Sequence, residues 1–187
     1  MPKLLVFNNL SVDGRFVDQN GTMNWAKENN DEEFNAFGSE NAKGGGTLVF
    51  GRVTYELMAS FWPTQQARDS LPIVAERMNN GPKIVFSRTL EKASWNNTRL
   101  IQGDMVAEIR KMKQEPGDGM VILGSGSVVA QLAREGLVDE YQIVLNPVAL
   151  GGGRTMFDGL KERLRLKLAK SRVFRSGKVF LSYQPIA

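Results

Sequence analysis

The sequence predicts an α/β fold whose sheet is mostly parallel and ends in an antiparallel hairpin. Short apolar runs, TLVF at 47–50, KIVF at 83–86 and MVIL at 120–123, alternate along the chain with segments of helical periodicity. Strands that alternate with helices favour a parallel sheet covered by helices on both faces. Near the C-terminus, two further runs flank Ser176-Gly177, which predicts a closing hairpin and therefore a mixed sheet.

Strands are expected where apolar residues occur together or alternate with polar ones. The run RLRLKLAKSRVFR at 163–175 places Leu164, Leu166 and Leu168 between basic residues, which predicts a half-buried strand. The polar stretch 11–21 is expected to be a long loop. The expected strands lie, in chain order, at 3–8, 47–50, 82–88, 94–101, 120–124, 141–150, 163–175 and 178–183.

Helices are expected where apolar residues recur every three or four positions between start and stop signals. Asp31 and Glu32 suit the positive end of a first helix dipole. Ser70 is a candidate cap for a later helix with Pro72 in its first turn, and Asp104 is a candidate cap for the next. The expected helices lie at 31–43, 53–62, 71–80, from Asp104 onward, and at 128–136.

The composition excludes several kinds of site. The chain has no cysteine and no histidine, so thiol nucleophiles, Ser-His-Asp triads and the common zinc sites are impossible, and no metal site is expected. Any acid-base chemistry must come from Asp, Glu, Lys, Tyr, water or the substrate. The 187 residues contain no linker or repeat, so residues 1–187 are expected to form one domain.

The charge and hydropathy patterns favour a small anionic ligand over a macromolecular partner. The net charge of +4 is small and scattered, which does not favour nucleic acid. No apolar stretch reaches the length of a membrane span, and the N-terminus lacks the pattern of a signal peptide. The expected location is the cytoplasm, with no membrane partner.

The first of three candidate anion sites lies between the strand 47–50 and the helix that follows it. Gly51 and Arg52 form this corner, and Thr54 follows. A helix N-terminus offers unpaired N–H groups and a partial positive charge, to which Arg52 would add a bidentate donor and Thr54 a hydroxyl. The alternative is a turn with a solvated arginine and a threonine cap.

Two further corners follow apolar strands in the same way. Gly124, Ser125, Gly126 and Ser127 lead from the strand 120–123 into a helix, where glycine would let the backbone approach a pyrophosphate closely. The alternative is a tight turn with Ser127 as the helix cap. Ligands bind beyond the carboxyl ends of parallel strands, so these corners together suggest one ligand with several phosphates.

The third corner is Ser87-Arg88, which ends the run KIVFSR. This pair could hold one additional phosphate, and the alternative is a surface arginine after an edge strand. Two carboxylates are also ambiguous. Asp31 is either a helix cap or a pocket carboxylate that binds a protonatable heterocycle, and Asp13 is either part of an Asp-Gly turn or a site residue.

These segments, in this order, resemble the dihydrofolate reductase superfamily. FGRVTYELM is similar to that family's strand and Gly-Arg-x-Thr segment, IVFSR to its next strand, and VILGSGSVVAQL to its glycine loop and helix. SVDGRF and GLVDEYQIVLNPVALGGGRTMFDG resemble more closely the branch that contains the riboflavin-biosynthesis (RibD) reductase C-terminal domain and its stand-alone relatives. The resemblance covers nearly the whole chain and implies a dihydrofolate reductase-like α/β/α fold.

The resemblance also implies a cofactor and residue roles. It implies that NADPH binds at the three corners, with Ser87 and Arg88 at the adenosine 2′-phosphate, and that Asp31 matches the acidic residue that binds a pterin ring. It implies a small-molecule substrate of pterin-like or pyrimidine-like chemistry, and relatives suggest a homodimer. The alternative is a non-catalytic NADP-binding regulatory protein. The implied cofactor-binding residues are Asn8, Ser11, Asp13, Gly51, Arg52, Thr54, Ser87, Arg88, Gly124, Ser125, Gly126, Ser127 and Val128.

Overall fold

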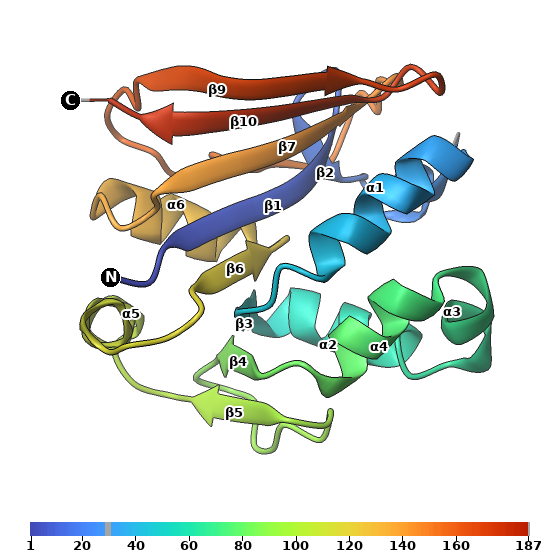
Figure 1. Ribbon diagram of the computed structural model, residues 1–187. Coiled ribbons are helices and arrows are strands. Elements are labelled where there is room, and N and C mark those ends of the chain that lie inside the picture. The colour runs from blue at the N-terminus through green and yellow to red at the C-terminus, as the bar shows by residue number, and fades with distance from the viewer. Residues whose placement is uncertain (29–30, 187) are drawn as a thin grey trace.

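A central sheet of eight strands lies between two layers of helices in the computed structural model, which describes residues 1–28 and 31–186 (Figure 1). The strand order is β5-β4-β3-β6-β1-β7-β10-β9, and β2 pairs with β8 in a separate two-stranded sheet. The strands are β1 Leu4–Ser11, β2 Arg15–Val17, β3 Thr47–Gly51, β4 Lys83–Phe86, β5 Thr98–Ile101, β6 Met120–Leu123, β7 Glu140–Asn146, β8 Arg154–Thr155, β9 Leu166–Val173 and β10 Val179–Pro185. The helices are α1 Glu32–Ala42, α2 Arg52–Phe61, α3 Gln65–Ser70, α4 Pro72–Asn80, α5 Met105–Gln114 and α6 Gly126–Arg134, with one 3-10 turn at Asn24–Lys27.

The pairing confirms the predicted mixed sheet. β1 is parallel to β6 and β7, β3 is parallel to β4 and β6, and β4 is parallel to β5. β10 is antiparallel to both β7 and β9, so the C-terminal hairpin closes one edge of the sheet. The carboxyl ends of β3, β4, β6 and β1 therefore lie along one side, as parallel pairing requires.

The period of two along each strand divides the core between the two faces of the sheet. In β3, Val49 faces a cluster that includes side chains of α5 and α6, whereas Leu48 and Phe50 face a cluster that includes α2 and α4. Near the other edge, Phe34 and Phe37 of α1 pack with Phe174, Phe180 and Val144. Both faces are thus covered, as expected for a sheet with parallel strands at its centre.

Two expectations for the connecting segments are wrong. The stretch 11–21 is not only a loop, because β2 forms within it and pairs with β8 while Phe16 and Val17 are buried. Ser70 does not cap a helix but is the last residue of α3, a helix that was not expected; Leu71 occupies the N-cap position of α4. The Thr64 hydroxyl accepts a hydrogen bond from the Ala67 N–H, which starts this additional helix.

The C-terminal strands also differ from the expectation in extent and burial. β7 ends at Asn146 because Pro147 has no N–H for the ladder. The expected half-buried strand at 163–175 is β9, which starts only at Leu166 and is almost entirely exposed, with Leu168 48% accessible. β9 is an edge strand that pairs only with β10. Leu164 and Leu166 are partly buried against the core cluster that includes α5 and α6, as the alternation predicts, whereas Leu168 is exposed.

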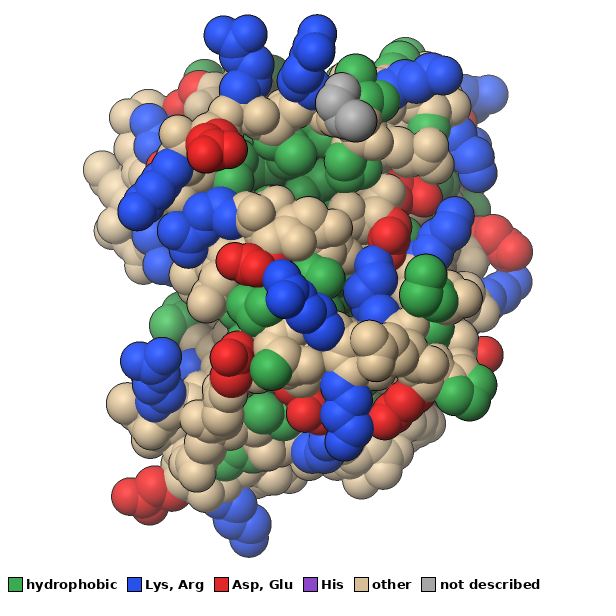
Figure 2. Space-filling model, turned by 90° about the vertical axis from the view of Figure 1, so that its left-hand side faces the viewer, with side chains coloured by type: hydrophobic (Ala, Val, Ile, Leu, Met, Phe, Trp, Pro, Cys, Tyr) green, Lys and Arg blue, Asp and Glu red, His purple; other side chains and the backbone are tan. Residues whose placement is uncertain are grey.

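The surface has no single sign of charge over the face drawn in Figure 2, where basic and acidic side chains both occur across its width. This distribution agrees with the small net charge of +4. Among residues 1–28 and 31–186, none of the helices is long and apolar enough to cross a membrane.

Candidate functional site

One cavity of about 710 Å³ lies beyond the carboxyl ends of β3, β4 and β6. Its wall joins the three corners that the sequence singled out, together with the segment after β5 and one residue of β8. The predicted residues that line it are Gly51, Arg52, Thr54, Ser87, Arg88, Ser125, Gly126, Ser127 and Val128. The remaining lining residues are Val53, Phe86, Ile101, Gln102, Gly103, Asp104, Met105, Gln131 and Arg154.

The β3–α2 corner and the β6–α6 corner are tied to each other by two hydrogen bonds. The Gly51 N–H donates to Oγ of Ser125 at 2.8 Å, and the Ser125 N–H donates to Oγ1 of Thr54 at 3.0 Å. Thr54 is only 8% exposed. Its hydroxyl oxygen is therefore an internal acceptor, and the role of Thr54 is largely to hold the two corners in register.

A left-handed backbone turn forms the start of α6. Gly124 has φ +57° and Ser125 has φ +53°, so Ser125 is a non-glycine residue in a conformation that glycine favours. The side chain of Asn8, which is 2% exposed, stabilises this turn from β1: Oδ1 accepts from the Gly124 N–H at 2.6 Å, and Nδ2 donates to the Gly124 carbonyl at 3.2 Å. Asn8 thus supports the site from behind its wall.

Ser125, not Ser127, occupies the N-cap position of α6, and no side-chain hydrogen bond caps this helix. The first amides of a helix have no acceptor within the helix itself. The Val128 N–H donates to the Ser125 carbonyl at 2.8 Å, so the N–H groups of Gly126 and Ser127 are the ones without an acceptor in the described part of the chain. Both residues line the cavity, where these two N–H groups provide donors with the positive end of the helix dipole. This geometry favours the anion-site interpretation over the alternative in which Ser127 caps the helix.

The corner after β4 presents a cation on a short turn. Oγ of Ser87 accepts from the backbone N–H groups of Thr89 and Leu90, at 3.2 and 2.9 Å, which shapes the turn. Arg88 makes no hydrogen bond or ion pair within the described part of the chain. Its guanidinium is therefore available to a ligand in the cavity.

The charged side chains of the wall are Arg52, Arg88, Arg154 and Asp104. Arg52 forms an ion pair with Glu56 at 3.0 Å one helical turn away, and both side chains are nearly half exposed. The Asp104 carboxylate accepts from the N–H groups of Val106 and Ala107, so it is occupied as the predicted cap of α5. The excess of positive charge favours an anionic ligand.

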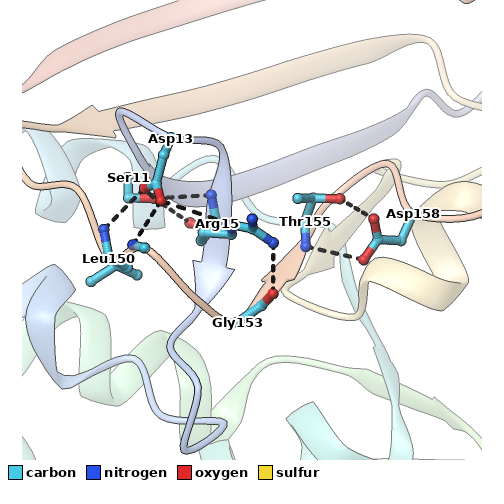
Figure 3. A network of polar contacts seen from close by, with 8 residues as sticks. Ser11, Asp13, Arg15, Leu150, Gly153, Thr155 and Asp158 are labelled. Carbon is cyan, nitrogen blue, oxygen red and sulfur yellow. Dashed lines mark hydrogen bonds and ion pairs between the residues drawn. The ribbon is translucent and has the colours of Figure 1, made fainter.

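Ser11 and Asp13 belong to a neighbouring network, outside the cavity wall (Figure 3). The Asp13 carboxylate accepts from the Ser11 hydroxyl at 2.6 Å and from the N–H groups of Leu150 and Gly151 at 3.0 and 2.9 Å. The Ser11 hydrogen bond, followed by these backbone bonds, lowers the pKa of Asp13 to about 2. Asp13 is thereby an ionised anchor for the loop that follows β7.

Asp31 lies outside the cavity wall, at the N-cap of α1. Its carboxylate accepts from the Phe34 N–H at 2.8 Å, which is the cap interpretation made from the sequence. Beside it is Lys178, whose Nζ donates to the Ala26 carbonyl at 2.8 Å and lies 4.5 Å from the Phe34 ring centroid. Burial lowers the pKa of Lys178 to about 8, and the charge of Asp31 opposes that shift.

Sequence reasoning missed several residues of this region. Arg154 was included only in the segment that resembles the RibD branch, and Lys178 was assigned only to a strand, because a single basic residue in either pattern carries no signal of its own. Gln131 follows Ser127 by one helical turn, so both share a face of α6. That spacing could have identified Gln131 once Ser127 had been placed.

Replacement of Gly126 with alanine tests how tightly the α6 corner is packed. A Cβ at this position would lie 2.7 Å from Cε1 of Phe16, a ring that is 3% exposed and has little room to move. We expect Gly126→Ala to lower the free energy of unfolding by about 1–3 kcal/mol, as overpacking does, in urea denaturation.

The matched control is Gly38→Ala within α1, where a Cβ would meet nothing within 4 Å. This substitution should raise the free energy of unfolding by about 0.5–1 kcal/mol through helix propensity. A Gly126→Ala protein as stable as the native one would contradict the close packing of Phe16 against the corner.

Comparisons with known proteins place this geometry in a family. Residues 2–180 match the family model described as the RibD C-terminal domain. The uncharacterized protein YyaP of Bacillus subtilis (strain 168) is 29% identical over 174 residues, which cover 93% of this chain and 90% of YyaP.

Two solved structures have the same fold. A Shewanella sp. PV-4 protein, whose name assigns it provisionally to riboflavin biosynthesis, is 24% identical, with a TM-score of 0.74 and 99% of both chains covered. Enterococcus faecalis dihydrofolate reductase, solved with NADP(H) and RAB-propyl, is 16% identical, with a TM-score of 0.64 and 99% of this chain and 97% of that chain covered. The predicted dihydrofolate reductase-like fold is confirmed, and the chain belongs to the RibD C-terminal domain family.

Proposed function

We propose that this protein is an NADPH-dependent reductase that transfers a hydride to an electron-poor C=N or C=O carbon of a pyrimidine-like or pterin-like small molecule. The observation that carries the proposal is that the wall of one cavity of about 710 Å³ includes all three strand-end corners and three arginines. The alternative interpretation, in which each corner is only a surface turn with a solvated arginine, does not explain why the three corners line the same cavity.

The spacing of the corners suits the phosphates of one dinucleotide. β4 and β6 are separated by β3, so their ends lie about two strand spacings, or ~10 Å, apart. In this proposal Ser87 and Arg88 bind the 2′-phosphate of the adenosine, and the N-terminus of α6 binds the pyrophosphate. Gly124, fixed by Asn8, keeps that N-terminus in position. The nicotinamide end then lies toward Asn8, Ser11 and Asp13.

The family and the fold support the choice of cofactor. The sequence resembles the riboflavin-biosynthesis reductase domain, and residues 2–180 match the RibD C-terminal domain model. The Enterococcus faecalis dihydrofolate reductase of the same fold was solved with NADP(H). Bound NADPH supplies the hydride, and the protein binds and orients both reactants and excludes water. A homodimer and a cytoplasmic location stay predictions.

Arg52→Ala tests the β3–α2 corner directly. If the Arg52 guanidinium contacts a cofactor phosphate, its removal should weaken NADPH binding at least tenfold, about 1.4 kcal/mol, measured by calorimetric titration. The control is Glu56→Gln, which removes the ion pair of Arg52 but keeps the guanidinium. It should leave the NADPH affinity within about twofold of the native value (about 0.4 kcal/mol). An Arg52→Ala affinity that is also within about twofold would remove this corner from the phosphate site.

The reductase activity is tested by following NADPH oxidation with a panel of pyrimidines, pterins and small carbonyl compounds. At least one of them should be reduced. NADPH that binds tightly but is oxidised with none of them would favour the alternative, a non-catalytic NADP-binding regulatory protein.

Asp31→Asn then tests the source of the proton, which in this proposal is Asp31 or water. Asparagine caps a helix as well as aspartate does, so α1 and the free energy of unfolding should be preserved. If Asp31 donates the proton, turnover should fall at least about tenfold while the NADPH affinity stays within about twofold. Unchanged turnover would assign the proton to water.

A further inference from the structure

Arg154 is the cation of the cavity wall that none of the three strand-end corners supplies. It comes from β8, which pairs with β2 in the separate two-stranded sheet. The Thr155 carbonyl oxygen lies 3.4 Å from the position that a Cβ on Gly126 would occupy. β8 therefore packs directly against the start of α6, and Arg154 lies near that helix N-terminus. α6 follows β6 and Arg88 follows β4, and β3 lies between these two strands.

The backbone on both sides of Arg154 is held by side chains (Figure 3). The Arg15 guanidinium donates to the Gly153 carbonyl at 2.7 Å, and the Asp158 carboxylate accepts from both the backbone N–H and the hydroxyl of Thr155. Gly153 has φ +106°, and a Cβ there would lie 2.0 Å from the Val17 carbonyl oxygen. Because only glycine fits at that approach, the position of the next residue is closely defined.

The side chain of Arg154, in contrast, has no hydrogen bond or ion pair within residues 1–28 and 31–186. The ring of Phe16 lies beneath it, with Cζ of Arg154 5.5 Å from the ring centroid, and Phe16 is buried. The hydrogen bonds from Thr155 lower the pKa of the Asp158 carboxyl most, and the charges of Arg15 and Arg154 lower it further. A guanidinium on a fixed backbone and above a fixed ring retains N–H donors for a bidentate contact.

We propose that Arg154 binds a phosphate group of a ligand beside the N-terminus of α6, at the end of the cavity away from Arg88. The helix amides and the guanidinium would act on the same anion. This inference rests on the proposed function, and two molecules can supply the phosphate: NADPH through its pyrophosphate, or the molecule that is reduced through a phosphate of its own.

Arg154→Gln separates these two sources by titration with three probes. Adenosine 2′-monophosphate contains the 2′-phosphate but no pyrophosphate, so its affinity should stay within about twofold of the native value. If the pyrophosphate is the partner, the NADPH affinity should fall about tenfold. If a substrate phosphate is the partner, NADPH should bind as before, and ribose 5-phosphate should bind about tenfold more weakly to the protein saturated with NADPH.

The matched control is Arg68→Gln on α3, an exposed arginine outside the cavity wall with the same loss of charge. If Arg68→Gln lowers the affinity for the same probe as much as Arg154→Gln does, the inference is overturned, because the effect would then come from the change in net charge. Affinities for NADPH and ribose 5-phosphate that both stay within about twofold in Arg154→Gln would also overturn it.

A further variant separates loss of the contact from loss of folding. Arg154→Lys keeps the charge but not the bidentate geometry of the guanidinium. Its affinity for the same probe should fall less than that of Arg154→Gln, and its melting curve should be unchanged. If the native protein binds no NADPH, the proposed function fails, and titration of ribose 5-phosphate alone still decides whether Arg154 binds phosphate. The other case is that the native protein binds NADPH and that Arg154→Gln changes neither the NADPH affinity nor the ribose 5-phosphate affinity. That result rejects the role of Arg154 but leaves the proposed function in place.

Discussion

The candidate site depends on the left-handed turn at Gly124 and Ser125, because hydrogen bonds from two different strands converge on it. Asn8 of β1 pairs with both backbone groups of Gly124, while Ser125 bonds with Gly51 at the end of β3 and with Thr54 in the first turn of α2. A non-glycine residue with φ +53° is costly unless its surroundings enforce it. These bonds enforce it, and they fix the start of α6 relative to β1 and to the β3–α2 corner.

Much of this arrangement could be predicted from the sequence, because short apolar strands followed by glycine and arginine identify strand ends in a parallel sheet. The three corners were found in this way, and the structure brings them into one cavity. The division of labour among the residues could not be predicted. Thr54 and Asn8 were expected at the ligand, whereas their side chains bond with the backbone of Ser125 and Gly124, which only the long-range pairing reveals.

The residues that the sequence missed depend on contacts between distant segments. β2 and β8 are two or three residues long and carry no periodic signal, so neither their pairing nor the position of Arg154 could be inferred locally. In β9 the alternation correctly indicates that Leu166 packs against the core, but Leu168, farther along this edge strand, is exposed. Lys178 is similar: its burial follows from the packing of α1 against β10 and not from the residues beside it in sequence.

One ligand is proposed to span the three strand-end corners. A crystal structure of the protein with NADPH tests this most directly. We predict that the adenosine 2′-phosphate lies within hydrogen-bond distance of Ser87 and Arg88, and that the pyrophosphate lies at the first amides of α6. NADPH bound outside this cavity would contradict the proposal. So would NADPH whose phosphates lie beyond hydrogen-bond distance of Ser87, Arg88 and the first amides of α6.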